Sequence, residues 1–221
     1  MDTEAGAPRR TGHLSVPTAT LIAVSVTTFM LPLDYTIVSV ALHDIQGSLH
    51  TGYAGLQWVV NGYTLTFAAL LMAGGALGDR YGRKRLFMLG TATFSLASLL
   101  AGLASTALVL NLARAVQGVG AAVMLAAAVP LLTQEFQGRA RTRAFAVFGV
   151  AVGTGAGLGP LLGGLVVSGL GWRWAFLLNV PVGAAMLLLT RARVRESRDP
   201  GARRIDWTGM AAFTIAAAAL V

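Results

Sequence analysis

The sequence predicts an all-α, polytopic membrane protein: a six-helix bundle followed by the start of a seventh transmembrane helix. Of its 221 residues, 55% are hydrophobic and only 12% are charged, and the mean hydropathy is +0.68. Water-soluble proteins carry about 25% charged residues, so this chain has too little polar surface to cover a soluble globule. Its basic residues gather in short clusters between long apolar stretches, which is typical of loops on one side of a membrane.

Six apolar stretches are long enough to cross a membrane, because about 30 Å of hydrocarbon requires about 20 helical residues. They predict one bundle over residues 18–191, preceded by a cytoplasmic tail, 1–17. The basic segment 192–204 is predicted to be a cytoplasmic linker, and 205–221 the truncated beginning of a seventh span, so the chain is expected to be part of a longer one. The six expected spans are 18–42, 54–77, 86–104, 107–131, 144–168 and 172–191.

The distribution of basic residues predicts the orientation of the bundle. Of the 17 basic residues, all but Arg114 and Arg173 lie in the N-terminal tail or in the loops after the second, fourth and sixth spans. Basic loops face the cytoplasm, so we expect a multi-pass protein of the cytoplasmic (inner) membrane with a cytoplasmic N-terminus. The same clustering accounts for the net charge of +8 and makes the lipid bilayer, and not nucleic acid, the expected partner.

The sequence carries no pattern typical of an enzyme. It contains no cysteine and only three scattered histidines. It also has no nucleotide-binding loop, metal-ligand spacing or nucleophile–base arrangement. We therefore expect no catalytic residues, no metal and no cofactor.

The loop after the second span contains an acid among cations. Residues 78–85 read Gly-Asp-Arg-Tyr-Gly-Arg-Lys-Arg. Four basic residues and turn-forming glycines would suffice for a cytoplasmic anchor, which is the simpler interpretation. Asp79 does not help such an anchor, but it could pair with Arg83 and so fix the ends of the second and third helices.

The fifth span is rich in glycine. Gly155, Gly159 and Gly163 recur every four residues and therefore share one helix face, where another helix can approach closely. Pro160 removes a backbone hydrogen bond at the same point and favours a bend. Ordinary small-residue packing is one interpretation of this segment. A nucleotide-binding loop is excluded, because no glycine register or preceding strand fits one.

Two opposite charges are expected at the same depth in the membrane. Asp34 lies about 6 Å, and Arg114 about 7 Å, from the centres of the first and fourth spans, both towards the outside. Ionisable residues inside a span usually face the bundle interior, so the two could form a structural buried ion pair. Alternatively, movement of Asp34 relative to Arg114 would change its proton affinity and so couple protonation to conformation.

Together with residues 171–183, Gly-Trp-Arg-Trp-Ala-Phe-Leu-Leu-Asn-Val-Pro-Val-Gly, these motifs resemble the major facilitator superfamily. The resemblance is to the N-terminal half of its fourteen-helix drug:proton antiporters (EmrB/QacA-like). It implies proton coupling by Asp34 and Arg114, although His43 stands where that family usually has proline. The implied cytoplasmic latch residues are Asp79, Arg80, Gly82 and Arg83. The implied antiporter motif consists of Gly155, Gly159, Pro160, Gly163 and Gly164.

The resemblance implies a function in transport. We expect proton-coupled efflux of drugs, antibiotics or other small molecules, driven by the proton motive force. The expected substrate is an apolar or cationic drug, and the expected partners are the missing C-terminal helices or a second chain. Two alternatives remain open: a truncated, non-transporting fragment, and an exporter of an endogenous metabolite. We expect no transport by residues 1–221 alone, because the family needs a second bundle to close its cavity.

Overall fold

The computed structural model describes residues 14–198. Over this range the chain forms seven helices and no strand, which confirms the all-α fold class. The expected tail, basic linker and seventh span fall wholly or partly on residues 1–13 and 199–221, which lie outside the described residues. The helices are α1 (Val16–Leu49), α2 (Tyr53–Tyr81), α3 (Arg83–Gly102), α4 (Ala107–Glu135), α5 (Gly138–Leu170), α6 (Trp174–Leu177) and α7 (Asn179–Arg193).

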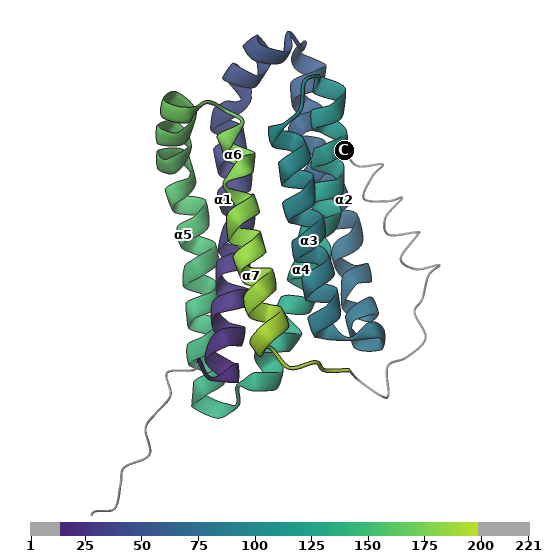
Figure 1. Ribbon diagram of the computed structural model, residues 1–221, viewed down its shortest axis with the longest axis vertical. Coiled ribbons are helices and arrows are strands. Elements are labelled where there is room, and N and C mark those ends of the chain that lie inside the picture. The colour runs from purple at the N-terminus through teal and green to yellow at the C-terminus, as the bar shows by residue number, and fades with distance from the viewer. Residues whose placement is uncertain (1–13, 199–221) are drawn as a thin grey trace, which may run out of the picture.

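The long helices run side by side along the long axis of the molecule (Figure 1). Among the described residues, α1, α3, α4, α5 and the unit formed by α6 and α7 (Trp174–Arg193) are long and apolar enough to cross a membrane. The remaining expected span, 54–77, lies within the 29-residue helix α2. Each of the six expected spans is therefore helical.

Two helices, α1 and α5, extend furthest beyond the apolar stretches that predicted them. α1 ends at Leu49 and not at residue 42. The next residue, His50, adopts a left-handed conformation (φ 49°) and closes the last turn. α5 begins before its apolar stretch, at Gly138. Hydropathy marks where apolar side chains stop, whereas a helix continues until a capping residue ends it. His43 is consequently an exposed residue of α1.

The sixth span is not one continuous helix. It is divided into α6 and α7, and Leu178 separates them. Pro181 lacks an N–H group, so it cannot donate to the carbonyl of Leu177 four residues earlier. This missing bond favours an interruption in the first turn of α7, where Asn179 lies.

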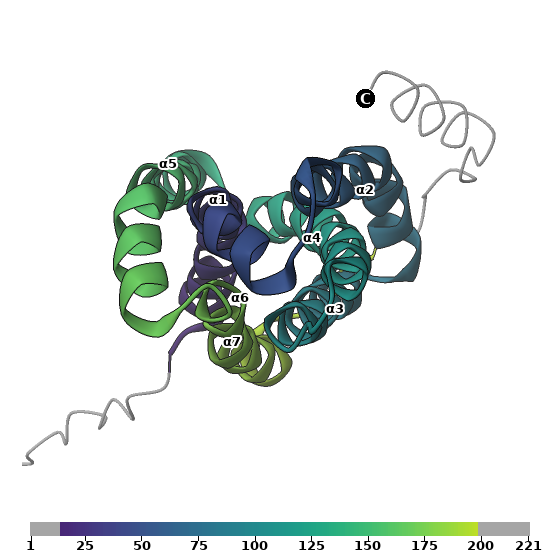
Figure 2. The same ribbon diagram turned by 90° about the horizontal axis from the view of Figure 1, so that it is seen from above.

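The helices pack around α4, which lies along both α2 and α3 (Figure 2). α5 packs mainly on α1, and α7 contacts α3 and α1. α1 also contacts α4, so it connects the α5 side of the bundle to the α2–α4 side.

A polar layer separates two apolar cores. On α1, Met30 and Leu31 belong to the first core and Ile37 and Val38 to the second, and the buried Asp34 lies between them. On α3, on α4 and on the unit of α6 and α7, buried polar residues likewise separate the two cores: Ser98, Arg114, Gln117 and Asn179. The fold therefore gathers polar side chains from four helices at one level.

Two glycines allow α3 and α4 to cross in close contact. A methyl group at Gly90 would lie 2.8 Å from the carbonyl oxygen of Gly120, and one at Gly120 would lie 2.5 Å from the backbone nitrogen of Phe94. Real Cβ atoms essentially never come this close to a backbone atom. The backbones of α3 and α4 would have to separate to admit either side chain.

We expect Gly90→Ala and Gly120→Ala each to destabilise the fold by about 1–3 kcal/mol, because both overpack this crossing. Gly47→Ala in α1 is the matched control, since no atom lies within 4 Å of the added methyl group. Thermal unfolding of the purified variants in detergent, followed by circular dichroism, measures the difference. Equal midpoints for Gly90→Ala and Gly47→Ala would contradict the close crossing.

Candidate functional site

The polar layer contains a buried ion pair. Arg114 Nη1 on α4 donates to Asp34 Oδ2 on α1 at 2.6 Å, and both side chains are fully inaccessible to solvent. The structure thus brings together the two charges that the sequence places at equal depth. A charge is costly to bury unless it is paired and hydrogen-bonded, so each residue depends on the other.

Two further side chains, Gln117 and Asn179, complete the hydrogen bonds of Asp34. Gln117 Nε2 donates to Asp34 Oδ1 at 2.9 Å, and Asn179 Nδ2 donates to the same oxygen at 2.7 Å. Gln117 also donates to Ser98 Oγ at 2.8 Å, and its Oε1 accepts a hydrogen bond of 2.7 Å from Arg114. Every direct partner of the Asp34 carboxylate is an N–H donor, so this arrangement suits an ionised aspartate.

Arg114 is enclosed on its remaining sides by α2 and α6. Its Nε donates to the carbonyl oxygen of Val59 at 3.0 Å. The guanidinium carbon lies 4.3 Å from the centre of the Tyr63 ring and 5.8 Å from that of Phe176. Nη2 is buried and has no hydrogen-bond partner among the described residues. The cation is therefore held by an acid, a carbonyl group and aromatic faces, with one donor left over.

Local helix geometry brings these groups together. Arg114 and Gln117 are three residues apart on α4 and therefore share a face. Asn179 is the first residue of α7, directly after the interruption at Leu178, which places its amide beside Asp34. Gln117 belongs to the same stretch of the fourth span as Arg114, and Asn179 to the motif 171–183. The sequence analysis assigned neither a role, because a polar residue in a motif does not reveal its partner.

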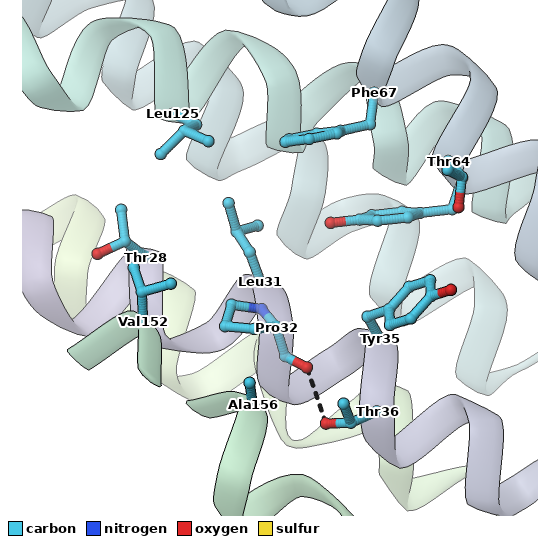
Figure 3. Close-up of a pocket in the computed structure, with 11 residues that line it drawn as sticks. Thr28, Leu31, Pro32, Tyr35, Thr36, Thr64, Phe67, Leu125, Val152 and Ala156 are labelled. Carbon is cyan, nitrogen blue, oxygen red and sulfur yellow. Dashed lines mark hydrogen bonds between the residues drawn. The ribbon is translucent and has the colours of Figure 1, made fainter. Parts of the chain in front are cut away.

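A cavity of about 560 Å³ adjoins the ion pair between α1, α2, α4 and α5. Tyr63 belongs to its wall, and Figure 3 shows Phe67 and Leu125 across the hollow from Thr28 and Val152. None of the lining residues is charged, and most are apolar. The lining residues are Thr28, Leu31, Pro32, Tyr35, Thr36, Tyr63, Thr64, Phe67, Leu125, Val152 and Ala156.

The glycine row of α5 packs against α1. A methyl group at Gly155 would lie 2.5 Å from the carbonyl oxygen of Phe29, and one at Gly159 would collide with Thr36. A methyl group at Gly163 would lie 3.2 Å from the Cα atom of Ile37. These three glycines are buried, as expected of a shared contact face. The other two predicted motif residues, Pro160 and Gly164, do not belong to this face: Pro160 is exposed, and Gly164 has open space beside it.

The loop between α2 and α3 turns at Gly82, which has a φ of 107°. Arg80 is exposed and lies over the ring of Tyr81. The backbone of Asp79 belongs to α2, but its side chain lies outside the described part of the structure. Arg83 begins α3, and its N–H donates to the carbonyl of Ser197 at 2.9 Å. Whether the four predicted residues act as a latch remains a prediction.

Glu196, which the sequence analysis did not select, caps α3. Its carboxylate accepts hydrogen bonds from the backbone nitrogens of Lys84 and Arg85 at 3.0 and 3.2 Å. A methyl group at Gly82 would lie 2.8 Å from the same carboxyl group. The one available signal was an acid within the arginine-rich stretch 191–198. The segment after α7 is therefore tied to the loop after α2.

The described residues contain no group of three or more histidine, aspartate or glutamate side chains that could hold a metal ion. A helical bundle that crosses a membrane and buries a charge pair beside an apolar cavity has the architecture of a membrane transporter. The chain belongs to the Major Facilitator Superfamily, whose family model matches residues 24–220. The family resemblance drawn from the motifs is thereby confirmed.

The curated relatives include proteins of drug efflux, resistance and export. The drug efflux pump JefA of Mycobacterium tuberculosis is 45% identical over 192 residues, which are 86% of this chain and 38% of that protein. The methylenomycin A resistance protein of Streptomyces coelicolor is 42% identical over 95% of this chain and 44% of its own length. The cephamycin export protein CmcT of Amycolatopsis lactamdurans is 42% identical over 90% of this chain and 42% of its own length. The chain thus spans less than half of each relative.

A solved structure supports the fold. The peptide transporter POT in complex with sulfate superposes with a TM-score of 0.70 at 16% sequence identity, over 91% of this chain and 44% of that one. At this identity the likeness concerns the fold alone. The bundle described above is therefore an arrangement that a known membrane transporter also contains.

We expect Asn179→Ala to destabilise the fold by about 1–3 kcal/mol, because it removes one of the two donors to Asp34 Oδ1. Asn179→Asp should cost more, since it places a second carboxylate beside a buried one. Thermal unfolding in detergent ranks the stabilities of the two variants and the unchanged protein. A variant Asn179→Asp as stable as the unchanged protein would contradict the described contact.

We expect Glu196→Ala to lower stability by about 1 kcal/mol, because it leaves backbone donors of α3 without their charged cap. Glu135→Ala, at the end of α4, is the matched control. Hydrogen exchange at the amides of Lys84 and Arg85 is the direct measurement. Unchanged exchange in Glu196→Ala would show that the cap does not form in solution.

Proposed function

We propose that residues 18–191 form the N-terminal six-helix bundle of a transporter that exports small molecules across the cytoplasmic membrane in exchange for protons. In this proposal the N-terminus and the loop after α2 face the cytoplasm. The observation that carries it is the fully buried Asp34–Arg114 pair next to an uncharged cavity. The relatives in drug efflux and resistance support export as the direction of transport.

The way Asp34 is bonded supports the proposed proton coupling. Its two oxygens accept hydrogen bonds from Arg114, Gln117 and Asn179. A proton on either oxygen would neutralise the acid, and one on Oδ1, which already accepts two hydrogen bonds, would displace one of its N–H donors. The network would then have to rearrange, and Arg114 would lose the charge that balances it. Protonation and conformation are therefore coupled at this one residue.

The glycine row would transmit such a rearrangement to α5. Gly155 and Gly159 contact α1 at Phe29 and Thr36, on either side of Asp34 in the sequence. A shift of α1 at this level acts directly on the α5 backbone, because the glycines place no side chain of α5 between the two helices. We assign this role to the predicted antiporter motif.

The predicted latch would act at the cytoplasmic end. Asp79, Arg80, Gly82 and Arg83 are proposed to break and re-form contacts as the two bundles of the complete transporter rock about the cavity. The cap that Glu196 provides on α3 adds the segment after α7 to this latch. The proton motive force would supply the energy, without a cofactor.

Export of an endogenous antibiotic is a second candidate. Two of the relatives are named for methylenomycin A resistance and cephamycin export. Expression in a drug-sensitive host, challenged with a panel of toxic compounds, would distinguish the two. Resistance to several unrelated compounds supports drug export, whereas resistance to a single antibiotic class supports the second candidate.

We expect Asp34→Asn to abolish proton-coupled efflux in the complete transporter while leaving membrane insertion intact, because asparagine cannot exchange a proton. Efflux from vesicles under an imposed pH gradient measures the effect, and we expect a loss of at least about tenfold. Asp44→Asn, an exposed acid on the same helix, is the matched control. Undiminished coupled efflux by Asp34→Asn would refute the coupling role.

A further inference from the structure

Tyr63 contributes to both the cavity and the ion pair. Its ring lines the cavity between α1, α2, α4 and α5, yet only 5% of the residue is exposed. The same ring lies 4.3 Å from the guanidinium carbon of Arg114. One aromatic side chain thus separates the space where a ligand would bind from the charge pair that would bind the proton.

Three aromatic rings gather at this wall of the cavity. Tyr63 and Phe67 are stacked with an interplanar angle of 5° and their centres 5.9 Å apart. The ring of Tyr35 is tilted by 41° to that of Tyr63, 6.5 Å away. Figure 3 shows Phe67 and Tyr35 at the same end of the cavity. A planar aromatic ligand gains most on such a surface, because aromatic pairs favour offset-stacked and edge-to-face contacts.

The electrostatics of the cavity favour an uncharged ligand. None of its described lining residues carries a formal charge, and both oxygens of the nearby Asp34 are occupied by protein donors. The ring of Tyr63 already interacts with the Arg114 cation. A second cation in the cavity would find no free acid there, and the Tyr63 ring that could attract it already interacts with Arg114.

Arg114 is sensitive to the placement of Tyr63. Its Nη2 is buried without a hydrogen-bond partner among the described residues, so the Tyr63 ring is a large part of the remaining environment of the cation. A ligand that displaces this ring leaves the guanidinium less well surrounded. The interaction of Arg114 with Asp34 must then change, since the acid is its only charged partner among the described residues.

We propose that Tyr63 is a positioning residue that transmits occupancy of the cavity to the Asp34–Arg114 pair, and that the cavity takes uncharged, planar aromatic molecules. The inference rests on the proposed transport function, which it makes more specific. It assigns Phe67 to ligand binding alone, because its ring lines the cavity four residues beyond Tyr63 and stacks on Tyr63.

The first test measures binding to the complete transporter in lipid nanodiscs. The probes are N-phenyl-1-naphthylamine, an uncharged aromatic dye, and tetraphenylphosphonium, an aromatic cation. We expect the dye to bind at least tenfold more tightly than the cation, and Tyr63→Leu and Phe67→Leu each to weaken dye binding about tenfold. Tighter binding of the cation, or unchanged dye binding by Tyr63→Leu, would overturn the proposal.

The second test follows Asp34 itself by infrared difference spectroscopy at saturating dye. The carboxylate band is assigned as the one missing in Asp34→Asn. We expect the dye to shift this band in the unchanged protein, in Tyr63→Phe and in Phe67→Leu, but not in Tyr63→Leu. A shift that persists in Tyr63→Leu, or one that disappears in Tyr63→Phe, would overturn the positioning role.

Folding of the variants is checked by thermal unfolding. If Tyr63→Leu does not fold, Tyr63→Met replaces it, because methionine fills a similar space without a ring. Both tests are equilibrium measurements, so their outcome does not depend on transport. If the unchanged protein shows the binding and the band shift but no proton-driven efflux, the proposed function fails and the role of Tyr63 stands. If it shows proton-driven efflux but no band shift, the proposed function stands and the role of Tyr63 fails.

Discussion

The structure depends on a pair of opposite charges that is fully removed from solvent. Asp34 and Arg114 can remain there only because each is bonded to the other and to further groups, since an unpaired charge in this environment costs several kcal/mol. Their partners come from α2, α4 and α7, and Gln117 reaches Ser98 on α3. Satisfying one carboxylate and one guanidinium therefore fixes the relative positions of five helices, α1 included. The apolar cores on either side of this layer pack the helices together, and the polar layer fixes how far each helix is shifted along its neighbours.

The same layer explains why the fold needs backbones in close contact. α1 carries Asp34 and must approach α4 while it packs on α5, and α3 must bring Ser98 to Gln117. Glycines at the α1–α5 and α3–α4 contacts remove the side chains that would hold the helices apart. α5 keeps a second row of glycines, Gly149, Gly153 and Gly157, with open space beside them. Glycine on this helix is therefore not explained by one contact face alone.

Much of this fold was predictable because a membrane constrains sequence strongly. Length and hydropathy located the spans, and depth along antiparallel helices sufficed to pair Asp34 with Arg114. The features that the sequence could not reveal depend on the direction of a side chain or on how a helix begins or ends. Gln117 and Asn179 were visible as motif residues, but hydropathy does not report which way an amide points. Glu196 was hidden because its partners are backbone groups about 110 residues away. The interruption before Asn179 was signalled only by Pro181, which is also common in the first turn of uninterrupted helices.

α7 connects the centre of the bundle to the end at which α3 begins. Its first residue, Asn179, donates to Asp34, and the segment that follows its last turn places Glu196 on the N-terminus of α3. Between these contacts lie 15 helical residues, a rod of about 22 Å. A helix of this length is stiff along its axis, so a displacement of Asn179 has to appear at Glu196 or be absorbed by the short segment between them. α7 thus links the hydrogen bonds of Asp34, at one end, to the cap on α3, at the other. A loss of the Asp34 charge would act on that cap through this helix.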